Sequence, residues 1–170
     1  MRSMRKWLGC SVALLAIVSL SLLLSSPALA QPRPMEMDVF TPIAKGYDLM
    51  RAGNYEAAQF EFETALKKDR FNPFALNNLA ALMEKQGKMK DAMAFLTDAQ
   101  THAGKYLDKV EQTCFVGGLC AGVKPVQAVG PTSSIAPVIA ENMKKLQDKM
   151  AATPTKPEPS TPPPMEEKKK

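Results

Sequence analysis

The chain has 170 residues, of which 45% are hydrophobic and 23% are charged, so it is long enough for one modest domain. Lys and Arg number 22 against 17 Asp and Glu, but Arg2, Arg5 and Lys6 lie in a segment that we expect to be removed, which leaves 19 bases against 17 acids. This near-neutral balance excludes a strongly basic protein of the kind that binds nucleic acid.

The first thirty residues have the layout of a secretory signal peptide. Three bases precede a mostly apolar run at residues 7–24, and Ala28-Leu29-Ala30 supplies small residues for a signal peptidase. We therefore expect cleavage after Ala30 and export, with the bacterial periplasm as the compartment. The alternative is an uncleaved inner-membrane anchor at residues 7–24, because this run is just long enough to cross a bilayer. Membrane contact is expected only in that case.

The stretch from Gly53 to Leu66 is echoed by a second stretch that begins at Gly87. Four pairs of positions keep the same offset: Gly53 and Gly87, Ala58 and Ala92, Phe62 and Leu96, and Ala65 and Ala99. A fixed period of this length indicates a stacked helical repeat. The spacing of glycine, alanine and bulky apolar residues resembles the tetratricopeptide repeat, with two repeats at about residues 39–72 and 73–106.

The resemblance implies an all-α fold in which antiparallel helix pairs form a short right-handed superhelix. Apolar residues at three- and four-residue intervals predict a helix from about residue 39 to Gly53, with Thr41 as a cap and Pro42 as the first helical residue. Further helices are expected at about 54–68, 74–86 and 89–102. Gly53 and Gly87 end the first and third helices, because glycine tolerates the left-handed turn there.

Two repeats are fewer than such folds usually need, so the flanking residues should complete the stack. We expect residues 107–133 to hold the rest of a short helix (Lys105 to Cys114) and then a Gly/Pro loop, and residues 134–151 to form an amphipathic helix. The apolar seam of that helix either caps the repeats or pairs with another copy of the chain. Residues 31–38 are expected to form an extended leader, and residues 152–170 a disordered tail rich in Pro and Lys.

Two cysteines, Cys114 and Cys120, remain after the expected cleavage. An oxidising compartment favours a disulfide between them. This bond would close a short loop and raise the free energy of unfolding by about 2 kcal/mol. The alternatives are a redox pair or metal ligands. Catalytic pairs usually have two residues between the cysteines, however, and here there are five. A single histidine, His102, is also too few for a usual zinc site.

Motifs for catalysis are missing from the sequence. There is no Gly-rich phosphate loop, no paired metal-ligand motif and no Gly-x-Ser-x-Gly turn. We therefore expect no catalytic residues, no cofactor and no metal.

In tetratricopeptide proteins the inner face of the superhelix holds an extended peptide or a partner helix. The resemblance maps that face to two sets of residues: Phe40, Ile43, Tyr47, Met50 and Arg51 in the first repeat, and Phe74, Asn77, Asn78, Ala81, Glu84 and Lys85 in the second. Asn78 matches an asparagine that in such repeats often contacts the main chain of a ligand. Ile43 and Tyr47 replace the Lys and Asn of a carboxylate clamp, so a hydrophobic peptide or helix is the expected ligand. The alternative is that the leader or the last helix covers Phe40, Ile43 and Tyr47.

The resemblance thus implies a non-catalytic adaptor or scaffold in the periplasm whose partner is another protein. Two alternatives stay open. One is a structural subunit that forms a homo-oligomer through the helix at 134–151. The other is a thiol-redox or metal-handling protein that uses Cys114 and Cys120.

Overall fold

Five helices and a two-stranded sheet make up the described part of the chain, which is residues 34–118 and 120–152 of a computed structural model. All of these elements belong to one compact unit that begins at Arg33. The expected signal peptide, the leader up to residue 33 and the tail from residue 153 lie outside the described residues. The prediction of an all-α fold is confirmed in part, because the described chain is mostly helical but also contains a small sheet that was not predicted.

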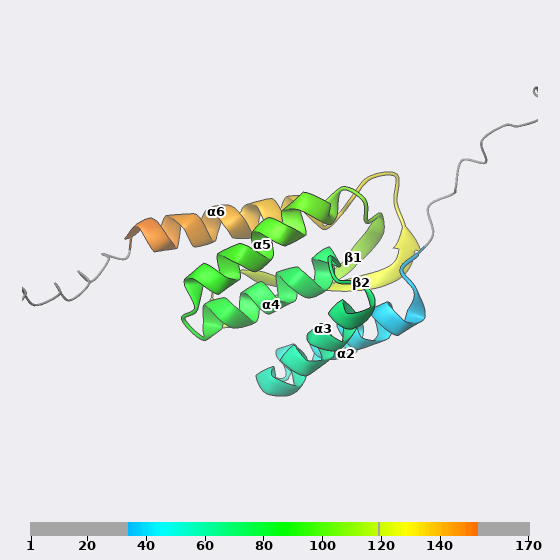
Figure 1. The fold of residues 1–170 in the computed structure, drawn as a ribbon, viewed down its shortest axis with the longest axis horizontal. Helices are drawn as coiled ribbons and strands as arrows, with labels where there is room; N and C mark the ends of the chain where they lie inside the picture. Colours follow the sequence, from blue (N-terminus) through cyan, green and yellow to red (C-terminus); the bar gives the residue numbers. More distant parts are fainter. Residues whose placement is uncertain (1–33, 119, 153–170) are drawn as a thin grey trace, which may run out of the picture. The chain divides into compact units, whose positions relative to one another are not determined.

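The first four helices form two antiparallel pairs. Helix α2 (Met37–Arg51) packs along α3 (Tyr55–Lys68), and α4 (Pro73–Lys85) packs along α5 (Met89–Ala103). Helix α3 also contacts α4, so the second pair lies against the first (Figure 1). The bounds of α3, α4 and α5 differ from the predicted ones by a single residue at some ends.

The turns inside the two pairs have the same backbone geometry. Gly53 and Gly87 have φ angles of +84° and +77°, a left-handed conformation that costs glycine nothing. The hydrogen bonds of the two turns also match position for position: Gly53 N to Met50 O and Asn54 N to Leu49 O in one, and Gly87 N to Glu84 O and Lys88 N to Met83 O in the other. The predicted role of both glycines is therefore confirmed.

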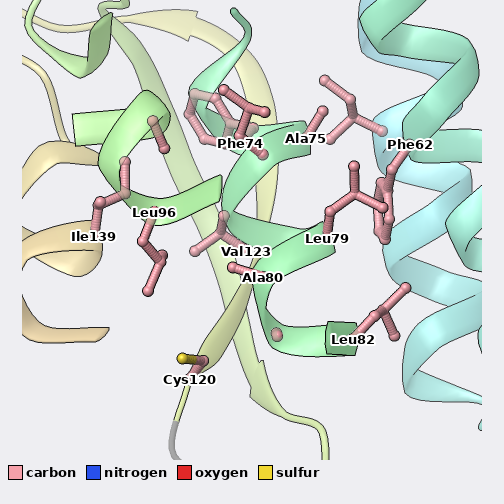
Figure 2. Close-up of a cluster of buried hydrophobic side chains, with 14 of the residues drawn as sticks. Phe62, Phe74, Ala75, Leu79, Ala80, Leu82, Leu96, Cys120, Val123 and Ile139 are labelled. Atoms are coloured by element: carbon pink, nitrogen blue, oxygen red, sulfur yellow. The ribbon is translucent and has the colours of Figure 1, made fainter. Parts of the chain in front are cut away.

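Small residues let the paired helices approach closely. Ala58 and Ala65 in α3, like Ala92 and Ala99 in α5, are fully buried. The ring of Phe62 fits against Gly46, where an added Cβ would lie 2.6 Å from the ring. Figure 2 shows members of the same core from α3, α4, α5 and later elements, among them Phe62, Leu79 and Leu96.

Helix α2 begins earlier than predicted, at Met37 rather than at Pro42. Its N-cap is Glu36, so the prediction of Thr41 as the cap is wrong and Pro42 lies inside the helix. The earlier start lets Val39 join the buried core together with Met35, whose N–H donates to the Asp108 carboxylate at 2.8 Å. Burial of these side chains offsets the hydrogen bond that a proline inside a helix omits.

The segment after α5 forms a β-hairpin, so the predicted short helix at Lys105–Cys114 and the predicted loop are both wrong. Strand β1 (Asp108–Phe115) pairs antiparallel with β2 (Ala121–Val129), and Cys114 lies opposite Gly122. Strand β2 has three valines, and β1 has one each of Val, Thr and Phe, which suit a pleated surface better than a helix. The Gly117-Gly118 pair supplies the turn, with Gly117 at φ +69°.

Helix α6 (Ala136–Ala152) completes the core. Its seam residues Ile139 and Leu146 are fully buried, as is Ile135 just before it, and the helix packs on α5. Pro137 lies in the first turn, where its missing N–H has no helical partner to lose. The apolar seam is thus covered within one chain.

Candidate peptide-binding groove

The face predicted to bind a partner is buried beneath the chain's own hairpin. Strand β2 contacts both α2 and α4, and it passes behind α4 in Figure 1. Phe40 is half-buried, and Arg51 and Lys85 are exposed. The other predicted residues are buried: Ile43, Tyr47, Met50, Phe74, Asn77, Asn78, Ala81 and Glu84. An open groove was expected, with the leader or the last helix as the alternative cover, and the main cover is instead an extended strand.

Asn78 binds the main chain of this strand through both atoms of its side-chain amide. Its Nδ2 donates to the carbonyl oxygen of Val123 at 2.8 Å, and its Oδ1 accepts from the N–H of Val123 at 2.7 Å. The amide therefore replaces the peptide group of a neighbouring strand. Since Asn78 is fully buried on a helix, these bonds satisfy polar groups that water does not reach.

Two more asparagines bind the main chain of Ala121 in the same way. Asn77 Nδ2 donates to the carbonyl oxygen of Ala121 at 2.8 Å, and Asn142 Oδ1 accepts from its N–H at 2.8 Å. Asn142 Nδ2 donates to Asn77 Oδ1 at 2.8 Å and to the same carbonyl oxygen at 3.0 Å. Asn77 of α4 and Asn142 of α6 thereby bind the same edge of β2, and the two asparagines are also bonded to each other.

Glu84, two turns after Asn77 on α4, extends this row of main-chain contacts. Its Oε2 accepts from the N–H of Cys120 at 2.8 Å, and its Oε1 lies 2.9 Å from Lys149 Nζ of α6. The Glu84 side chain is wholly buried while that of Lys149 is 36% exposed, so the ammonium reaches in from the surface. The row on α4 thus contacts residues 121 and 123 of β2 and residue 120 just before it.

Helix α2 forms the opposite wall and contacts the side chains of the hairpin. Lys124 Nζ lies 3.1 Å from both carboxylate oxygens of Asp48. An added Cβ on Gly122 would overlap the Cε atom of Met50, so a larger residue at that position requires the end of the Met50 side chain to move. Arg51 Nη1 donates to Gln112 Oε1 at 3.4 Å, which links α2 to β1 as well.

The predicted disulfide is absent from the structure, in which Cys114 and Cys120 are free thiols. Cys114 lies opposite Gly122 in the register of the hairpin, so it is not directly opposite Cys120. Burial raises the pKa of the Cys114 thiol, against a lowering hydrogen bond with Tyr47. Burial and the neighbouring Glu84 raise the pKa of Cys120 to about 12.

His102 makes local contacts with an aromatic ring and a main-chain carbonyl group. Its ring stacks on that of Phe71, with centroids 4.3 Å apart, and its Nδ1 lies 2.9 Å from the carbonyl oxygen of Asp98. Within residues 34–118 and 120–152, no group of three or more His, Cys, Asp or Glu side chains is placed to hold a metal ion. None of the helices in this part of the chain is long and apolar enough to cross a membrane.

Asn77, Asn78 and Glu84 were predicted from the sequence, whereas Asn142 and the strand that they bind were missed. One signal was available for Asn142. It lies three residues after Ile139 and four before Leu146, so it occupies a position in an otherwise apolar seam. A polar residue at such a position must find a hydrogen-bond partner inside the core.

The fold and the site define a mostly helical protein in which two similar helix pairs and a final helix enclose a strand of the same chain. Searches against protein-family models, curated proteins and solved structures gave no significant match.

Proposed function

We propose that the chain is a non-catalytic protein-interaction module of the tetratricopeptide type, exported to the periplasm, whose inner face binds an extended protein segment. The observation that carries this proposal is the way in which three asparagines bind the main chain of β2. Side-chain amides that pair with backbone groups recognise an extended segment whatever its side chains.

The repeated geometry supports the tetratricopeptide type. Equivalent glycines end α2 and α4, and equivalent alanines lie between the paired helices. Helix α6 follows the second pair and packs on α5, in the place that the first helix of a third pair would take. In this arrangement α2, α4 and α6 are the inner helices, and these three supply the residues that contact β2.

The two alternative functions have less support. Self-association through α6 would need its apolar seam, but Ile139 and Leu146 are already buried in the same chain. Thiol-redox or metal chemistry would need reactive or clustered thiols, and the thiols of Cys114 and Cys120 face different partners, Tyr47 and Glu84.

Photo-crosslinking in cells tests the proposal. The probe is placed at Gln112 or Phe115, which are exposed on β1 and contact Arg51 of α2 and Lys145 of α6, and the matched control is placed at Gln147, which is exposed on α6. The proposal predicts that one protein is captured from both groove positions and not from the control. Capture of nothing from the groove positions, or equal capture from Gln147, would show that the inner face is not the binding surface.

A further inference from the structure

We propose that β2 is an exchangeable internal ligand, and that the groove's partner is an extended segment with the same chemical pattern as residues 121–124. That pattern is a small apolar residue, a glycine, a second small apolar residue and a cation. The inference rests on the proposed function, because it names the kind of segment that the same site accepts.

The pattern follows from the side chains around each position of β2. Gly122 lies where an added Cβ would overlap the end of the buried Met50 side chain, so a bulky residue there has to displace Met50. Ala121 and Val123 on either side are buried, so their sites have room only for small apolar side chains. A segment with a bulky residue at the glycine position would be held away from the asparagines of α4.

Charge complementarity defines the fourth position. Lys124 Nζ lies 3.1 Å from both oxygens of Asp48, and the side chains of Lys124 and Asp48 are 21% and 56% exposed, so the pair lies at the surface edge of the groove. A lysine or arginine of a partner would restore this pair, whereas an acid would be repelled by Asp48. The site therefore selects a cation two residues after the glycine.

Exchange would leave the three asparagines of the groove with hydrogen-bond partners. The main-chain groups bonded to Asn77, Asn78 and Asn142 belong to the peptide backbone, which every extended segment carries. A partner strand with the same pattern would form the same bonds as β2. The tether gives β2 an effective concentration in the millimolar range, so a free peptide competes only at similar concentrations.

Cys120 reports the exchange directly. Its side chain is 1% exposed, and its N–H is bonded to Glu84, so the thiol is hidden while β2 lies in the groove. When another segment takes that place, residues 120–124 leave and the thiol becomes accessible to a labelling reagent. Cys114→Ser and Cys114→Ala variants each leave Cys120 as the only thiol of the chain after Ala30.

The experiment measures the rate of Cys120 labelling in both variants with a synthetic peptide of sequence Ala-Gly-Val-Lys-Pro-Val-Gln, which copies residues 121–127. The proposal predicts that the peptide raises the rate in a saturable manner, by about tenfold or more. Control peptides with Leu in place of Gly, or Glu in place of Lys, should leave the rate unchanged. An unchanged rate with the copied peptide, or an equal rise with all three, would overturn the exchange.

A binding measurement on two further variants keeps the test decisive. Gly122→Leu drives β2 away from Met50, and Lys124→Glu sets two acids against each other at Asp48, so each should empty the groove. Fluorescence anisotropy of the labelled peptide should then show affinity at least about tenfold higher than for the wild type. Equal affinity in a folded variant of either kind would contradict the proposal. If the peptide does not exchange with β2 while the probes at Gln112 and Phe115 still capture a protein, the proposed function as a protein-interaction module is supported. Only the proposal that β2 is an exchangeable ligand is then wrong.

Discussion

At the scale of single residues, Asn78 carries the densest set of interactions with β2. We expect Asn78→Ala to lower the free energy of unfolding by roughly 2–4 kcal/mol, because it leaves both the N–H and the carbonyl of Val123 buried without a partner. Asn54→Ala is the matched control, since Asn54 is exposed and its side chain makes no capping bond. Its change should stay within about 0.5 kcal/mol. Urea denaturation measures both values, and similar losses would contradict the role of Asn78.

The left-handed turn at Gly87 gives a second prediction. A Cβ at φ +77° strains the backbone, so Gly87→Ala should cost about 1 kcal/mol although nothing lies within 4 Å of the added atom. Gly104→Ala is the control, because Gly104 has equally open space but an ordinary φ of −63°. That variant should be neutral or slightly more stable. In thermal unfolding, the melting temperature of Gly87→Ala should therefore fall, while that of Gly104→Ala stays the same or rises. An equal fall in both variants would contradict the predicted backbone strain at position 87.

Asp108 makes stability depend on pH. Burial raises its pKa above the usual 3.8, and the hydrogen bond from the Met35 N–H only partly opposes this. The folded protein then holds the proton more tightly than the unfolded chain, so the contribution of Asp108 is largest at low pH and falls as pH rises through the folded-state pKa. Asp108→Asn should gain stability relative to wild type as the pH rises above the usual carboxyl pKa of 3.8 in urea unfolding. A difference that stays constant as the pH rises would contradict the assignment.

These residues differ in how far the sequence revealed them. The turn glycines were predictable because a repeat of constant period places both at the same point of their helix pairs. Asn78 was found through the family resemblance, with main-chain contact as its expected role, but the segment that it contacts was not. Asp108 was not found, because its environment depends on Met35, which lies far away in the chain.

At the scale of elements, we expect the large buried residue between paired helices to contribute more to the free energy of unfolding than its exposed neighbour. Phe62 is fully buried against Gly46, whereas Phe60 is 62% exposed on the same helix. Phe62→Ala should lower the unfolding free energy by roughly 3–5 kcal/mol through loss of apolar burial and formation of a cavity. Phe60→Ala removes an exposed ring near Lys67 and should cost less than about 1 kcal/mol. Guanidinium denaturation compares the pair, and equal costs would mean that the helices are not packed through Phe62.

Helices and hairpin also differ in how well the sequence predicts them. The helices were accessible because apolar spacing, turn glycines and small residues agree with one another. The hairpin was mistaken for a helix and a loop because Tyr106, Leu107 and Val110 happen to match a helical interval. The β-branched residues on both sides of Gly117-Gly118 were the better signal. Pro125 did not exclude a strand, since the sheet has only two strands in the described residues and both are at an edge.

At the scale of the whole molecule, the hairpin and α6 supply the core that two helix pairs lack. Val123 from β2 and Ile139 and Leu146 from α6 belong to the same buried cluster as Phe74 and Leu96 (Figure 2). The need for additional residues to complete the stack was predictable from the count of repeats. That they would fill the inner face with an extended strand was not, because the fit depends on contacts between residues far apart in sequence, such as Met50 with Gly122.

Amide hydrogen exchange measured residue by residue tests the central claim, which is that β2 lies in the groove and is bound there by the asparagines. The N–H groups of Ala121 and Val123 donate to Asn142 and Asn78 and should exchange slowly. Thr113 is the internal reference. It pairs with Val123 but directs its N–H to the other edge of the sheet, where the described residues place no further strand, so it should exchange fast. Exchange at Ala121 and Val123 as fast as at Thr113 would contradict the account.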